Sequence, residues 1–147
     1  MFAPKKILVP TDFSKFSDEA LEKALDIARQ YQSAVHLLHV IVVTKQCADY
    51  YCLDDATMQM IQKKTMEASR DLMEKQVRRV VKSKDIGITS NIVLGVPNEE
   101  ILKEQKETRA DLIVIASRGM SGPPEHILMG AIAEKVLRGA RCPVLLV

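Results

Sequence analysis

Short apolar runs alternate along this chain with longer stretches in which apolar residues recur every three or four positions. Short runs are typical of buried strands, and the longer stretches of amphipathic helices. The runs predict five strands, at residues 5–10, 34–43, 88–94, 111–115 and 142–147. The stretches predict four helices, at residues 17–31, 57 to about 84, 99 to about 106, and 127 to about 139.

The regular alternation of strand and helix predicts an α/β fold. We expect one domain over residues 1–147, built on a doubly wound, five-stranded parallel sheet of order 3-2-1-4-5 with helices on both faces. Ligands of such sheets bind beyond the carboxyl ends of the strands, where the strand order reverses. If the first and fourth strands are central neighbours, Asp12 and the loop 118–130 meet at that point.

Two helices carry more detailed predictions. Ser14 or Ser17 is available as the N-cap of the first helix. Residues 44–56 have no clear period and are expected to form a mobile loop before the long helix. The long helix is expected to bury one apolar stripe made of Met58, Ile61, Ala68, Leu72, Val77, Val80 and Val81.

Composition narrows the classes of protein that fit. Hydrophobic residues make up 47% of the 147 residues, which favours a globular protein, and a net charge of +2 spread along the chain argues against nucleic acid as a partner. The longest apolar run, residues 34–43, is too short to span a bilayer. We expect no signal peptide, because residues 1–6 lead directly into a strand. Three cysteines without a CxxC pair favour a reducing, cytoplasmic location.

The segment 111–131 carries the strongest chemical signal. An apolar strand runs through a loop containing Gly119 and Gly122 into a helix that starts near Gly130. Backbone N–H groups and the positive end of a helix dipole converge in this geometry, which favours anion binding. The junction at residues 7–12 adds the carboxylate of Asp12. Together the two segments predict a nucleotide site.

Four motifs, in this order and at this spacing, resemble the universal stress protein family over essentially the whole chain. They are the opening ILVPTDFS from Ile7, GVPNEEI from Gly95, SRGMSG from Ser117 with GAIAEKVL from Gly130, and CPVLLV from Cys142. The resemblance implies a dimeric stress-response protein that binds an adenine nucleotide (ATP, ADP or AMP), with Mg²⁺ as a possible companion. The alternative is a dimeric interaction module of the same family that binds no nucleotide.

The glycine motif departs from that of the ATP-binding members. Those members carry Gly, two residues, Gly, nine residues, and then Gly followed by Ser or Thr. Here Ala116 replaces the first glycine, ten residues separate Gly119 from Gly130, and Ala131 replaces the hydroxyl residue. Two prolines after Gly122 remove backbone donors. Arg118 can replace some of them, because its guanidinium suits phosphate oxygens. We therefore expect weak phosphate binding with little preference among the three nucleotides.

Each candidate residue also has a simpler interpretation. The resemblance implies that Asp12 lies near the ribose and adenine, but an Asx cap of the following turn explains it equally well. Pro10 and Thr11 line the same edge or simply form the turn. Val40 contacts adenine by resemblance, or is a core valine. His36 and His39 lie on opposite faces of the second strand, and each is interpreted as a packed or hydrogen-bonded histidine.

The last strand predicts an interface. An uncovered apolar strand at the edge of a sheet recruits another strand, and the resemblance implies a homodimer through Val144, Leu145, Leu146 and Val147. Burial under the last helix alone is the alternative. The protein partner is not predicted. No nucleophile–base pair, metal cluster or carboxylate pair is recognisable, so the resemblance implies at most slow ATP hydrolysis.

Overall fold

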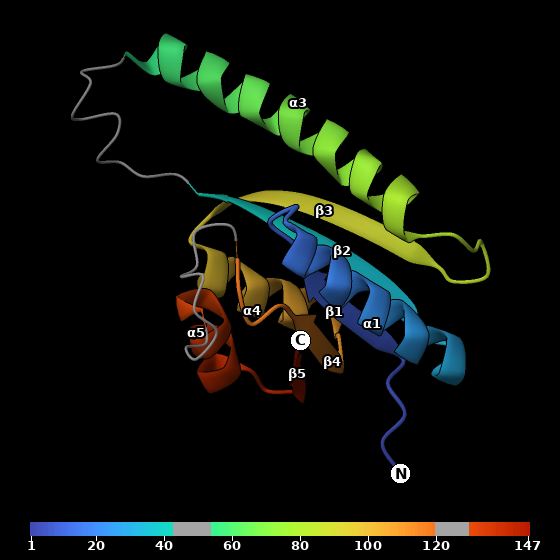
Figure 1. Ribbon diagram of the computed structural model, residues 1–147. Coiled ribbons are helices and arrows are strands. Elements are labelled where there is room, and N and C mark those ends of the chain that lie inside the picture. The colour runs from blue at the N-terminus through green and yellow to red at the C-terminus, as the bar shows by residue number, and fades with distance from the viewer. Residues whose placement is uncertain (43–53, 120–129) are drawn as a thin grey trace.

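The computed structural model describes residues 1–42, 54–119 and 130–147 (Figure 1). Five strands form its sheet: β1 (Lys6–Pro10), β2 (Ala34–Val42), β3 (Ile88–Gly95), β4 (Leu112–Ile115) and β5 (Val144–Leu146). Four helices are described: α1 (Lys15–Tyr31), α3 (Asp55–Val80), α4 (Pro97–Thr108) and α5 (Ala131–Gly139). Strand and helix alternate as the pattern predicted.

The sheet has the order β3-β2-β1-β4-β5, and its paired strands are parallel. This confirms the predicted order and places β1 and β4 side by side at the centre. Their register sets Ile7 opposite Leu112. The strand order reverses between β1 and β4, so the segments that follow these two strands leave the sheet next to each other.

Helices cover both faces of the sheet, as predicted (Figure 1). On one face, residues of α1 and α3 pack on the strands; its largest fully buried side chains include Ile7, Leu21, Leu25, Leu37 and Val114. On the other face, residues of α4 and α5 pack against Leu8, Leu38 and Ile113. The central strands are apolar on both sides because each side is covered.

The helix α1 starts two residues earlier than predicted. Ser14 is its N-cap, since the Ser14 hydroxyl accepts the N–H of Ser17 at 3.2 Å. Ser17 lies inside the first turn, where its own hydroxyl donates to the Ser14 carbonyl at 2.8 Å. The cap therefore fixes the direction in which the chain leaves β1.

The predicted apolar stripe of α3 is partly wrong. Ile61 and Leu72 are each 45% exposed, whereas the buried positions are Ser69, Met73, Gln76 and Val80. Two of these buried residues are polar. Gln76 is fully buried because its side chain is hydrogen-bonded to Thr11, before α1, and to Asp18 of α1. These partners are distant in sequence, so a hydrophobic pattern does not reveal them.

Several element ends also differ from the sequence predictions. The helix α3 ends at Val80 and not near residue 84, while β5 spans only three residues of the predicted 142–147. The helix α3 begins at Asp55, with the Asp54 carboxylate accepting the N–H of Thr57 at 2.7 Å. The predicted loop 44–56 otherwise lies outside the described residues, except for this capped helix start.

Candidate functional site

The candidate site lies at the carboxyl ends of β1 and β4. Pro10 ends β1 and is buried, and Thr11 and Asp12 follow it on the way to α1. Ala116 to Gly119 follow β4. The structure thus brings the two predicted segments to one edge of the sheet, as the strand order requires.

Asp12 lies directly beside Gly119. One carboxylate oxygen of Asp12, Oδ1, accepts the N–H of Ser14 at 3.0 Å, which is the Asx turn expected from its position. The other oxygen, Oδ2, would lie only 2.8 Å from a β-carbon placed on Gly119. A side chain at position 119 would therefore displace the carboxylate. Glycine permits this close approach, which explains why the second motif glycine is retained.

The turn after Asp12 is strained. Phe13 has a φ of 65°, in the left-handed region that non-glycine residues rarely adopt. Its ring packs on His39, with ring centroids 4.2 Å apart, and the Nδ1 atom of His39 lies 2.7 Å from the Thr11 carbonyl oxygen. These contacts stabilise the strained residue and keep Asp12 at the mouth of the strand.

The Thr11 side chain points into the protein. Its hydroxyl lies 2.8 Å from Oε1 of the buried Gln76 and 3.0 Å from Oγ of Ser17. The Nε2 atom of Gln76 donates to Asp18 at 2.8 Å. Thr11 therefore joins α1 to α3. Its hydroxyl also accepts the N–H of Phe13 at 3.0 Å and so supports the turn that contains Asp12.

The segment after β4 is tied to the end of the chain. The Ser117 N–H and the Ser117 hydroxyl both donate to the Val147 carbonyl oxygen, at 2.8 and 2.9 Å. The sequence analysis did not single out Ser117 for this role, because its partner lies 30 residues away. Ser117 thus fixes the direction of the segment that reaches Gly119.

The start of α5 lies against the same segment. The Gly130 N–H donates to the Ser117 carbonyl oxygen at 2.7 Å. Gly130 is the N-cap of α5, and no side chain caps this end among the described residues. A β-carbon on Gly130 would lie 3.2 Å from the same carbonyl oxygen, so glycine allows the close contact. Ala131, the first residue of α5, follows with no hydroxyl.

Arg118 points toward the start of α1. Its guanidinium carbon lies 5.6 Å from the centre of the Phe16 ring, a distance typical of a cation–π contact. Arg118 and Phe16 are both partly exposed. The cation therefore lies near the Asp12 turn and is partly open to solvent.

Three further predicted site residues are Val40, Ala116 and Gly122. Val40 packs against the apolar cluster beneath α4 and α5, and Ala116 packs against the cluster on the opposite face. Gly122 lies outside the described residues. His36 and His39 do face opposite sides of the sheet, since His36 lies 2.8 Å from Glu104 of α4 and His39 contacts Thr11.

The described residues include one thiol, that of Cys142. Within residues 1–42, 54–119 and 130–147, no three His, Cys, Asp or Glu side chains gather as metal ligands do. Burial raises the pKa of the Cys142 thiol, and the Asp111 carboxylate raises it further, so this thiol is a weak nucleophile. None of the helices in the described part of the chain has the length and apolarity needed to cross a membrane.

Comparison with known proteins establishes the family. Residues 4–147 match the model of the universal stress protein family, and the chain belongs to this family. It is 32% identical over 143 residues to Universal stress protein MJ0531 of Methanocaldococcus jannaschii, covering 97% of this chain and 81% of that protein. The solved structure of MJ0577 superposes with a TM-score of 0.84 at 29% identity, covering 99% and 96% of the two chains.

Two further solved structures hold nucleotides. One is a universal stress protein in complex with cAMP, at a TM-score of 0.69, 20% identity and coverage of 99% of this chain and 98% of that one. The other is the universal stress protein from Archaeoglobus fulgidus in complex with dAMP, at 0.58, 19% identity and coverage of 99% and 98%. At this identity the likeness is evidence for the fold.

Proposed function

We propose that this protein binds an adenine nucleotide at the edge formed by Asp12, Gly119 and the start of α5, as a stress-response protein that uses the nucleotide as a ligand or signal. The observation that carries the proposal is the approach of Asp12 Oδ2 to Gly119, where a side chain would push the carboxylate aside. Two universal stress proteins of the same fold are complexes with cAMP and dAMP, which supports an adenine nucleotide as the ligand.

The carboxylate suits the sugar of the nucleotide. Carboxylate oxygens accept hydrogen bonds from ribose hydroxyls, and an acidic residue recognises ribose in other doubly wound nucleotide sites. The Asp12 carboxylate is held by the Ser14 N–H and by the contacts of Phe13, so its position is set before the ligand arrives. Preorganisation of this kind lowers the cost of binding.

The phosphate end of the site is weaker. The Gly130 N–H already donates to Ser117, so this amide is not available to a phosphate oxygen. Ala131 offers a backbone N–H without the hydroxyl that motif-complete relatives carry. The partly exposed guanidinium of Arg118 remains as a cation for a phosphate. We therefore propose that AMP, ADP and ATP bind with affinities within about tenfold of one another.

Release of bound nucleotide tests the proposal directly. The purified protein is denatured, and the supernatant is examined for AMP, ADP and ATP; we expect adenine nucleotide from the wild type and none from Asp12→Ala. Asp26→Ala, at an exposed carboxylate of α1, is the matched control and retains the nucleotide. An empty wild-type protein that also fails to bind added nucleotide would leave the interaction module as the function.

We also propose a homodimer that forms through β5. This strand lies at the edge of the sheet, and Leu145 at its centre is 37% exposed. Pairing of two antiparallel copies about a two-fold axis would set Leu145 opposite its own copy. Leu145→Glu should then yield monomers in sedimentation experiments, because like charges would face each other. Leu72→Glu, at a residue 45% exposed on α3, should leave the dimer intact.

A further inference from the structure

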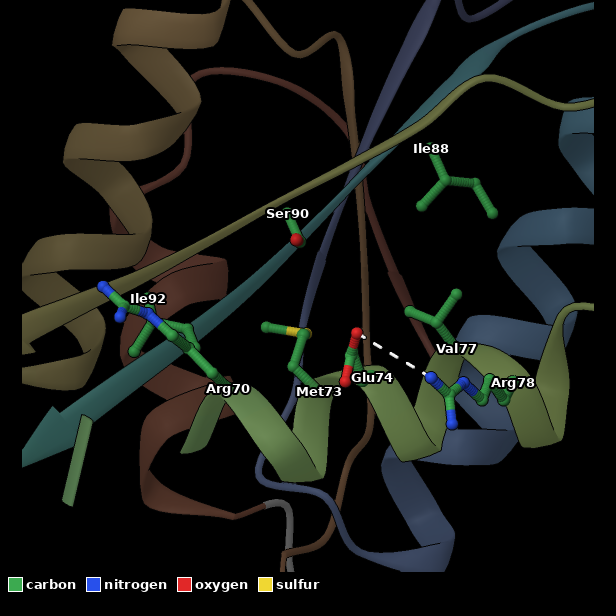
Figure 2. Close-up of a pocket in the computed structure, with 8 residues that line it drawn as sticks. All are labelled: Arg70, Met73, Glu74, Val77, Arg78, Ile88, Ser90 and Ile92. Atoms are coloured by element: carbon green, nitrogen blue, oxygen red, sulfur yellow. Dashed lines mark ion pairs between the residues drawn. The ribbon is translucent and has the colours of Figure 1, made fainter. Parts of the chain in front are cut away.

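A groove of about 550 Å³ runs between α3 and the edge strand β3, away from the candidate nucleotide site (Figure 2). Ile88, Ser90 and Ile92 of β3 form one wall, and all three point toward α3. Met73 and Val77 of α3 face them. The groove is therefore apolar along its middle and bordered by a sheet edge.

The outer edge of β3 is open to pairing. Among the described residues β3 pairs only with β2, so its other side has no strand partner. The Val35 N–H donates to the Gly87 carbonyl oxygen, so the backbone groups of Gly87 point toward β2. Along a strand the backbone groups of successive residues point alternately toward one neighbouring strand and toward the other side. The N–H and C=O groups of Ile88, Ser90 and Ile92 consequently point outward. These are the residues whose side chains line the groove. The Ile92 N–H donates to Oδ1 of Asn91 at 3.0 Å, so Ile88 and Ser90 carry the backbone N–H groups that an added strand would meet.

Within the described part of the chain, the strand β3 itself carries little protection against strand pairing. Long edge strands are normally blocked by lysines, prolines, bulges or short length. The strand β3 spans eight residues and contains neither a charged residue nor a proline. Its length and composition thus favour the addition of another strand.

Charge on α3 indicates what that strand carries. The helix α3, residues 55–80, contains six lysines and arginines against four aspartates and glutamates. Two of these cations, Arg70 and Arg78, lie at the groove with Glu74 between them. The Arg78 guanidinium lies 3.9 Å from the Glu74 carboxylate, a long distance for an ion pair, and both side chains are more than two-thirds exposed. Such a pair is readily exchanged for a new partner.

The spacing of the two arginines matches a strand. Arg78 follows Arg70 by eight positions, a rise of about 12 Å along the axis of α3. Four strand residues span about 13 Å and return to the same face. Side chains at positions i and i+4 of an added strand therefore fall near the two arginines. The side chain at i+2 falls between Met73 and Val77, where Glu74 disfavours a third acid.

We propose that this groove binds an extended acidic segment of a partner protein, which adds to β3 as a sixth strand. The segment carries Asp or Glu at positions i and i+4 and an apolar residue at i+2. Backbone hydrogen bonds to Ile88 and Ser90 supply affinity, and the two arginines supply selectivity. No residue of the candidate nucleotide site takes part.

The test uses a blocked seven-residue peptide, Thr-Asp-Thr-Val-Thr-Asp-Thr, titrated into the full-length protein by calorimetry and amide NMR. We expect saturable binding that shifts the amides of β3. The doubly substituted Arg70→Glu, Arg78→Glu protein should bind at least about tenfold more weakly. Lys63→Glu with Lys64→Glu makes the same change of charge at exposed positions of α3 outside the groove, and should bind as the wild type does.

A proline variant tests the backbone contacts separately. Ser90→Pro removes an outward N–H, a position at which edge strands tolerate proline. With an unchanged thermal unfolding temperature it should lose peptide binding. The proposal is overturned if the peptide does not bind, if both double variants weaken it equally, or if folded Ser90→Pro still binds it. It is also overturned if Ser90→Pro abolishes self-association of the free protein, because a second copy would then occupy the groove.

Discussion

The two helices that start at the candidate site differ in how their first turns are satisfied. At α1, the Ser14 hydroxyl accepts the Ser17 N–H and the Asp12 carboxylate accepts the Ser14 N–H. At α5, Gly130 is the N-cap, and no side-chain cap is found in the described part of the chain. The first turn of a helix presents N–H groups without partners inside the helix.

This difference suggests different roles for the two helix starts: the start of α1 stabilises the fold, and the start of α5 is suited to a ligand. The side chains at the start of α1 form a closed set of hydrogen bonds that joins β1, α1 and α3. The start of α5 has glycine and alanine in place of capping residues, so its amides depend on partners from outside the helix. In an α/β protein with helices on both faces of the sheet, a helix start at the switch point without a side-chain cap from the described residues is a place where an anion is well stabilised.

The largest effect on stability is expected from the side-chain hydrogen bonds at the start of α1. Thr11→Val should lower the free energy of unfolding by about 1–3 kcal/mol, because the buried oxygen of Gln76 loses its partner. Denaturant unfolding measures this change. Adding Gln76→Leu should recover part of the loss, since an apolar pair buries no unsatisfied group. Strictly additive losses in the double variant would contradict the hydrogen bond as the cause.

A smaller effect, on binding alone, is expected at α5. Ala131→Ser should raise ATP affinity by about tenfold, because a hydroxyl at this position can donate to a terminal phosphate. AMP has no terminal phosphates and serves as the matched control ligand, with unchanged affinity. Isothermal titration compares the two. An equal change for both ligands, or none, would mean that the start of α5 does not face the outer phosphates.

The smallest effect concerns a third helix start, that of α3. Hydrogen bonds from Thr57 hold the pKa of the Asp54 carboxyl below its usual value. A carboxyl whose pKa is lowered in the folded state stabilises the fold at pH values above its usual pKa. This contribution is lost as the pH falls through the pKa of the folded state. The first turn of α3 should therefore loosen at acidic pH. The Thr57 amide signal reports it, and Asp54→Asn should remove the pH dependence of that signal.

The sequence predicted what depends on local pattern. Alternating runs were sufficient for a parallel α/β sheet with helices on both faces. The expected strand order then placed Asp12 beside the segment after β4, because strand order dictates which carboxyl ends are neighbours. The buried face of α3 was wrong because Gln76 and Ser69 replace the apolar residues that a periodic stripe requires. The Ser117–Val147 contacts join segments 30 residues apart, and neither residue carries a local signal for them.

Amide NMR of the full-length protein during an AMP titration tests nucleotide binding most directly. The account predicts saturable shifts at Gly119 and Ala131 in the wild type. Asp12→Asn keeps the side-chain acceptor for the Ser14 N–H and should bind more weakly, whereas Asp12→Ala should show no shifts. Identical shifts in Asp12→Ala, or wild-type shifts confined to residues distant from Gly119, would contradict a nucleotide site at this edge of the sheet.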